Sequence, residues 1–110
     1  MPALEDIEEQ TLNLKGKRGF RWVREFRFWQ DAAHTIPWDL DGCTGRFVVD
    51  DELDISEGAG VSITGNTLKV ELTPVQMRIE KDAPHHYLTI TQPGEDPLLI
   101  FSGTLSISDP

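Results

Sequence analysis

Residues 19–29 have the sequence GFRWVREFRFW, which is the strongest local signal for a fold class in this chain. Phe20, Trp22, Phe26 and Phe28 share one parity of this stretch, whereas Arg21, Glu25 and Arg27 share the other. Side chains alternate between the two faces of a strand, so a period of two predicts a β-strand with one aromatic face. We expect Trp22 and the phenylalanines to lie in the core, because aromatic residues on strands are usually buried.

Four further stretches, all beyond residue 44, have strand patterns. They are GRFVVD (45–50), VSITGNTLKVEL (61–72), HHYLTITQ (85–92) and LLIFSGTLSISD (98–109). Within the second of them, Gly65-Asn66 predicts the two-residue turn of a hairpin. About seven short strands separated by Gly, Pro and Asn are typical of an all-β sandwich or a small barrel.

The segments between these strands predict connections. Gln30 to His34, together with Pro37, predicts the turn after the aromatic strand, and the acidic stretch DDELDISEGAG (50–60) predicts a loop rich in turn formers. Thr73 as N-cap and Pro74 at the first helical position predict one short helical turn over residues 75–79.

Length and composition favour one folded domain. The chain has 110 residues, of which 38% are hydrophobic and 26% charged, a balance that allows one core and excludes a disordered chain. Residues 1–11 form an acidic arm in this interpretation, and residues 12–110 form the domain. Neither a secretion signal nor a membrane span is apparent, so we expect the chain to be made and left in the cytoplasm, unless a larger assembly carries it out.

The net charge of -9 argues against a nucleic-acid partner, because neutralising phosphates requires an excess of Lys and Arg. Six of the ten basic residues nevertheless cluster near the N-terminus. This basic stripe consists of Lys15, Lys17, Arg18, Arg21, Arg24 and Arg27. It would suit an acidic protein surface, such as that of a neighbouring copy of the chain, with the acidic residues 50–57 as one partner. The alternative is that these side chains solvate one strand face and cover aromatic neighbours with their stems.

No motif for catalysis is visible, so we expect neither an enzyme nor a cofactor. Cys43 is the single cysteine, which excludes an internal disulfide, and we expect a buried, inert thiol. His85 and His86 are adjacent on a strand and point to opposite faces, so they cannot share one metal ion, and we expect exposed imidazoles. The acidic stretch 50–57 lacks the spacing of a calcium loop and indicates a solvated loop.

Two tryptophans flank the turn after the aromatic strand. Trp29 and Trp38 predict an exposed contact surface, because aromatic residues and Arg concentrate at interface hot spots. Together with Tyr87 they would alternatively provide a platform for a glycan of a host surface.

The order of these segments resembles a known family. WDLDGCTGRFVV (38–49) resembles the DLTGxTARMQIR segment of small immunoglobulin-like domains in bacteriophage tail and baseplate proteins, such as the N-terminal domain of the baseplate upper protein family. GVSITGNTLKVELTP (60–74), HHYLTITQPGEDP (85–97) and LLIFSGTLSISDP (98–110) follow in the same order as the family's segments. Residues 15–18, KGKR, stand where the family has a charged turn. The basic GKRGF replaces the family's usual GDTF, and the second turn is shorter here.

The resemblance spans residues 12–110 and implies an immunoglobulin-like β-sandwich that serves as a part of the virion. The expected function is a minor tail or baseplate protein, made in the bacterial cytoplasm, whose partners are other virion proteins and copies of itself. We expect it to dock through the arm, the basic stripe, Trp29 and Trp38. The alternatives are a capsid decoration protein that clamps major capsid subunits, and a module that binds host glycan.

Overall fold

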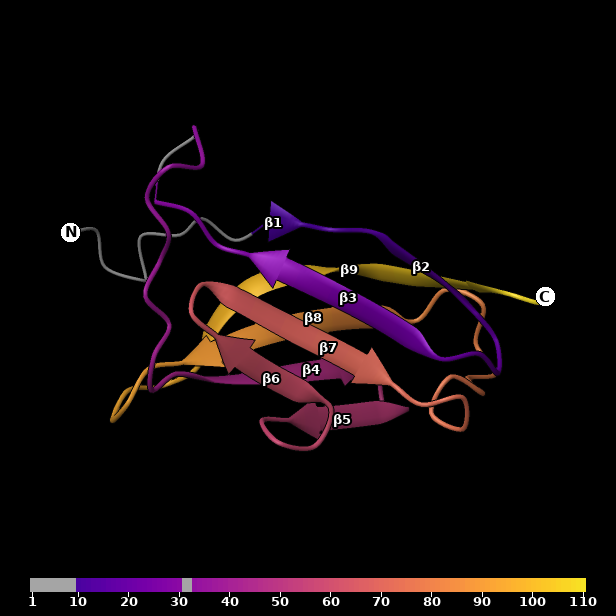
Figure 1. Ribbon diagram of the computed structural model, residues 1–110. Helices are drawn as coiled ribbons and strands as arrows, with labels where there is room; N and C mark the ends of the chain where they lie inside the picture. Colours follow the sequence, from indigo (N-terminus) through magenta and orange to yellow (C-terminus); the bar gives the residue numbers. More distant parts are fainter. Residues whose placement is uncertain (1–9, 31–32) are drawn as a thin grey trace.

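The computed structural model describes residues 10–30 and 33–110 and contains nine strands in two sheets (Figure 1). The strands are β1 (Gln10–Thr11), β2 (Leu14–Lys17), β3 (Trp22–Arg27), β4 (Thr44–Val49), β5 (Leu53–Ser56), β6 (Val61–Thr64), β7 (Thr67–Leu72), β8 (His85–Thr91) and β9 (Leu98–Ser108). Within those residues there is no helix that is long and apolar enough to cross a membrane.

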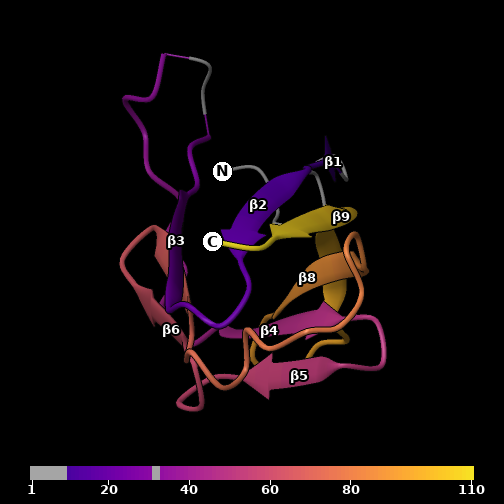
Figure 2. The same cartoon turned by 90° about the vertical axis from the view of Figure 1, so that its right-hand side faces the viewer.

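The strand order is that of an immunoglobulin-like sandwich. One sheet has the order β1-β9-β8-β4-β5, with β2 also paired to β9, and the other has the order β3-β7-β6. If β3 to β9 are assigned to the immunoglobulin strands B, C, C′, D, E, F and G, the sheets become C′-C-F-G and B-E-D, as in that fold. Figure 2 shows the two layers edge-on, with β3 and β6 on one side and β4, β5, β8 and β9 on the other. The predicted all-β, immunoglobulin-like class is therefore confirmed.

The core lies between the two sheets and is built from the alternating side chains that the sequence pattern predicts. Trp22 of β3 stacks on Phe47 of β4, with ring centroids 5.8 Å apart, and Phe47 has no exposed surface. Phe28 stacks on Phe101 of β9 at 6.0 Å. Trp22 on β3 and Phe28 directly after it thus pack on residues of the opposite sheet, and these pairs hold the two layers together.

Phe20 is an exception to the predicted aromatic face. It is 55% exposed, so the expectation that it is a core residue is wrong. The physical reason is that β3 begins only at Trp22, and Phe20 belongs to the preceding turn, where its N–H donates to the carbonyl of Lys17. Strand parity does not extend into a turn.

Three strands lie in segments for which the sequence predicted other structures. Gln10–Thr11, assigned to the arm, forms β1, and residues 15–17 of the supposed charged turn belong to β2, both parallel to β9. Leu53–Ser56, assigned to a loop, forms β5 as an edge strand beside β4. The remaining part of the arm, residues 1–9, lies outside the described residues.

The predicted helical turn is a single turn and not a helix. The N–H of Met77 donates to the carbonyl of Thr73 at 3.0 Å. The backbone N–H of Thr73 donates to Oε1 of Gln76, and that of Gln76 donates to Oγ1 of Thr73, which is the reciprocal pattern of a capping box. The predicted N-cap is thus present, but the chain continues without a second turn.

Candidate functional site

The six residues of the basic stripe do not lie in one row. Lys15 and Lys17 lie on β2, at the edge of the larger sheet, whereas Arg24 and Arg27 lie on β3 in the smaller sheet. The intervening residues carry the chain from one layer to the other (Figure 2). Proximity in sequence therefore does not make these side chains a continuous surface.

Arg18 is bound within the protein. Its guanidinium donates to the carbonyl of Ile79 at 2.8 Å, to Asp82 at 2.8 Å and to Asp109 at 2.5 Å, and its side chain is only 25% exposed. The two carboxylates raise the pKa of Arg18. This residue fastens the chain end to the turn between β7 and β8, which is a structural role.

Three other members of the stripe also have partners within the chain. Nε of Arg21 lies 2.8 Å from Oε2 of Glu71, which lowers the pKa of that carboxyl, and Arg27 pairs with Glu25 at 3.2 Å. Nζ of Lys17 donates to the Ser108 hydroxyl at 3.0 Å. These exposed contacts are weak, but a partner would have to compete with them.

Arg24 differs from these neighbours. It is exposed, and its side chain forms no ion pair or hydrogen bond with any residue that the structure describes. It shares its strand parity with Trp22 and Phe26, the side chains that face the core, and it sits opposite Val70 of β7. Arg24 is thus a solvent-exposed charge at a strand position whose parity is otherwise buried.

The strand that carries Arg24 has an open edge. β3 pairs with β7 along one side over all six of its residues, and within residues 10–30 and 33–110 no strand pairs with its other side. Val23, 36% exposed, lies on the same strand. Open backbone groups, an apolar side chain and an unpaired cation thus come together at this edge, which we call the β3 edge (residues 22–27).

The predicted aromatic contact surface is only partly present. Trp38 is 8% exposed and belongs to the hydrophobic core, so the expectation that it is exposed is wrong. Its N–H donates to the carbonyl of Phe28, which ties it beside β3 and turns its ring into the sandwich. Trp29 is half-buried and stacks on His34, with centroids 5.4 Å apart. Tyr87, 38% exposed, lies on β8 in the other sheet, so the three rings do not form one platform.

The two adjacent histidines point to opposite faces, as expected, but only His85 is exposed. His86 is 2% exposed, and its Nε2 lies 2.6 Å from the carbonyl oxygen of Leu12. The expectation of an exposed His86 imidazole is wrong because His86 shares the buried parity of Leu88 and Ile90 on β8, where the Leu12 carbonyl and the Phe47 ring lie against it. No group of three His, Cys, Asp or Glu side chains able to hold a metal occurs in the described part of the chain.

Cys43 is half-buried and its thiol is held in the protonated form. Burial raises its pKa, and the carboxylates of Asp39 and Asp41 raise it further, because negative neighbours disfavour a thiolate. Since the thiolate is the nucleophile, this setting opposes nucleophilic chemistry.

The acidic stretch is occupied by contacts within the chain. Arg46 donates two hydrogen bonds to Asp54, of 2.7 and 2.5 Å, and Nζ of Lys81 lies 3.1 Å from Asp51. Arg46 lowers the pKa of Asp54, and Lys81 lowers the pKa of Asp51. Glu57 accepts the N–H groups of Gly45 and Ile63. These pairings were not predicted from the sequence, since Arg46 and Lys81 lie outside the basic stripe.

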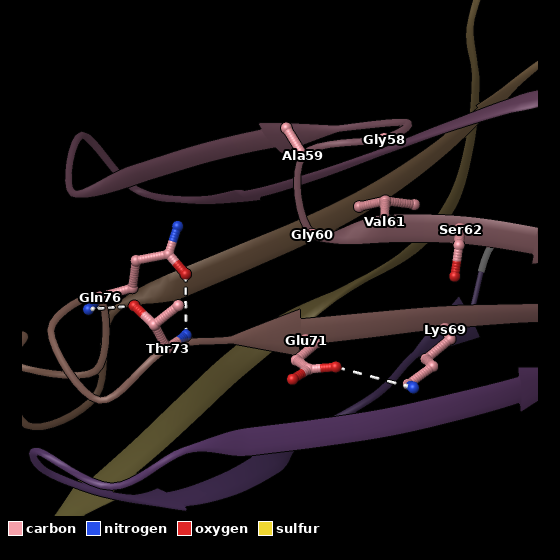
Figure 3. Close-up of a pocket in the computed structure, with 9 residues that line it drawn as sticks. All are labelled: Gly58, Ala59, Gly60, Val61, Ser62, Lys69, Glu71, Thr73 and Gln76. Carbon is pink, nitrogen blue, oxygen red and sulfur yellow. Dashed lines mark hydrogen bonds and ion pairs between the residues drawn. The ribbon is translucent and has the colours of Figure 1, made fainter.

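Two of the hollows on the described surface combine residues from several segments. The first, about 360 Å³, is lined by the β5–β6 turn, by β6 and β7, and by the turn after β7. Lys69 and Glu71 in it pair with each other at 3.6 Å (Figure 3). The second, about 570 Å³, lies over β8 and β9 and includes Tyr87 and Leu99, which is 40% exposed. Neither hollow was predicted from the sequence, because each combines residues from segments with no shared motif.

Comparisons with known proteins identify no family for this chain. No protein-family model and no curated protein matches this sequence.

Proposed function

We propose that this protein is a non-catalytic structural component of a bacteriophage virion, a minor tail or baseplate protein that binds neighbouring subunits through the β3 edge. Two lines support the proposal. The immunoglobulin-like sandwich agrees with what the family resemblance implies, and the β3 edge offers a docking surface that requires no further chemistry.

The observation that carries this proposal is the combination of an open edge with Arg24. A partner strand can add to an open edge, where backbone hydrogen bonds supply affinity. Arg24, without a partner among the described residues, then favours a partner segment with an acidic side chain at the matching position. The net charge of -9 makes a second copy of the chain one such acidic partner.

The same edge would serve the capsid alternative equally well, with a major capsid subunit as the partner. The glycan alternative lacks a comparable basis, since Trp38 is buried, Trp29 follows β3 of the smaller sheet and Tyr87 lies on β8 of the larger sheet. Location in the particle separates tail from head.

We expect this chain to be a constituent of purified phage particles from the strain that encodes it. Cryo-electron microscopy should place density for the sandwich at the tail tip or baseplate, with neighbouring density in contact with β3. Density on the capsid would favour the decoration role, and absence of the chain from particles by mass spectrometry would refute a virion role.

Arg24→Glu should strongly reduce incorporation into particles while leaving the domain folded. The substitution reverses one exposed charge and breaks no contact with a described residue. Quantitative mass spectrometry of purified particles measures incorporation, and circular dichroism of the free domain checks the fold.

Arg78→Glu is the matched control, because Arg78 is also exposed and the charge change is identical, but it lies in the turn after β7. Equal incorporation of the Arg24→Glu variant and the control would remove the β3 edge from the proposal.

A further inference from the structure

The first strand is held against β9 by a short set of specific contacts. β1 pairs with β9 through Gln10 opposite Phe101 and Thr11 opposite Ser102. The N–H of Leu12 then donates to the carbonyl of Ser102 at 2.8 Å. We call residues 10–13 the N-terminal latch. A two-residue ladder provides little stability by itself, so the side-chain contacts of this segment matter.

His86 supplies the most buried of those contacts. Its Nε2 lies 2.6 Å from the Leu12 carbonyl, and because a carbonyl can only accept, Nε2 must carry the proton. In the neutral ring Nδ1 is then an acceptor, and it is buried without a hydrogen-bond partner. The ring packs on Phe47, with centroids 5.6 Å apart, so one of its sides lies against an apolar side chain.

This arrangement accommodates the neutral ring and not the cation. A second proton would have to go on Nδ1, where no acceptor receives it, and the resulting charge would sit in a site that is 2% exposed. Burial lowers the pKa of His86, an effect that outweighs the hydrogen bond to Leu12, which acts in the opposite direction.

Among the residues that the structure describes, no carboxylate acts on His86 to stabilise a cation. Its neighbours across β8 are Val49 of β4 and Gly103 of β9, neither of which titrates. Of the described charged or titratable groups, only His85 on the same strand acts on it electrostatically, and that effect also lowers its pKa.

We propose that the N-terminal latch is a pH-sensitive device: neutral His86 holds residues 10–13 on β9, and its protonation releases them while β2 stays in place. β2 stays because Leu14, 2% exposed, anchors it in the core and its four residues pair with β9. Release leaves the β9 edge open at Phe101 and Ser102, where another strand can pair.

The sign of the pH dependence follows from linkage. In the released state His86 is solvated and titrates near its usual value of about 6.5, whereas in the latched state its pKa is lower. The latched state is therefore fully favoured above about pH 6.5. Below this pH the ratio of latched to released molecules falls, by up to about tenfold for each pH unit, until the latched ring also becomes protonated.

Hydrogen exchange of the full chain, followed by NMR, tests this directly. Leu12, whose N–H donates to Ser102, reports on the latch; Leu105 and Ile107, whose N–H groups donate to the carbonyls of Pro84 and Asp82, are internal references on β9. The ratio of the Leu12 rate to the reference rates cancels the intrinsic pH dependence of exchange. We expect this ratio to rise by up to about fivefold between pH 6.5 and 5.5, because the released ring is already half protonated at pH 6.5.

His86→Gln is the informative variant, because the Gln amide can still donate to the Leu12 carbonyl but does not titrate, and its exchange ratio should not change with pH. His85→Gln is the matched control and should behave as the natural protein does. A ratio that stays constant in the natural protein overturns the proposal, as does simultaneous loss of protection at all three amides. If His86→Gln does not fold, the measurement on the natural protein alone still decides.

Discussion

Replacing Phe47 by alanine should lower the free energy of unfolding by about 3–5 kcal/mol, the range for removing a large aromatic side chain from a core. Phe47 has no exposed surface, stacks on Trp22 of the opposite sheet and packs on His86. The cavity would open between the two layers, at a point that both sheets share. Because domains of this size are stable by only about 5–15 kcal/mol, we expect a much lower urea midpoint.

Tyr87→Ala is the matched control for this prediction. Tyr87 lies on β8 opposite Val48, the residue after Phe47, but it is 38% exposed on the outer face of the sheet. Its removal should lower the free energy of unfolding by clearly less, because deleting an exposed ring leaves no enclosed cavity. If both variants lost the same free energy of unfolding, the buried Phe47 ring would contribute no more to stability than the exposed Tyr87 ring.

Gly103→Ala should detach the N-terminal latch and destabilise the domain by about 1–3 kcal/mol, the usual cost of forcing extra atoms into a packed site. A Cβ at this position would lie 2.3 Å from the carbonyl oxygen of Leu12 and 2.8 Å from its carbonyl carbon. Those are backbone atoms, so no side-chain rotation relieves the clash. Leu12 must move, and its hydrogen bond to His86 is lost with it.

The effect of Gly103→Ala should be local as well as energetic. Exchange of the Leu12 amide should accelerate at neutral pH, while Leu105 and Ile107 remain protected. Ser106→Ala changes an exposed position three residues further along β9. It should change the free energy of unfolding by no more than about 0.5 kcal/mol and leave the exchange rate of the Leu12 amide unchanged. Normal protection of Leu12 in the Gly103→Ala variant would contradict the close packing of these two segments.

The sequence predicted those strands whose alternation reflects a buried face. Trp22 and Phe26 on β3 share one strand parity, Leu68 and Val70 on β7 repeat every second residue, and the Gly65-Asn66 turn fixes the β6–β7 register. β1, β2 and β5 were missed for a physical reason. β2 has the sequence LKGK, in which only Leu14 is buried, and its strand conformation depends on pairing with β9, some 91 residues away.

The candidate site was less predictable, because it depends on contacts that no local pattern encodes. Arg18 and Arg24 are equivalent in the sequence, yet Arg18 meets Asp82 and Asp109 whereas Arg24 meets no described partner. Similarly, the sequence indicates that His85 and His86 face opposite ways, but not which of them faces the core. That depends on how β8 is aligned between β4 and β9.

The parallel pairing of β1 and β2 with β9 also affects when the domain can form during synthesis. β1 and β2 are synthesised before the other strands of the sandwich, but their partner β9 (Leu98–Ser108) is synthesised after them. A nascent chain on the ribosome can form the β6–β7 hairpin early, because its strands are adjacent. Residues 10–17, in contrast, can pair only when β9 has been synthesised. Pairing across so long a separation slows folding. We therefore expect the sandwich to close only after β9 has been synthesised.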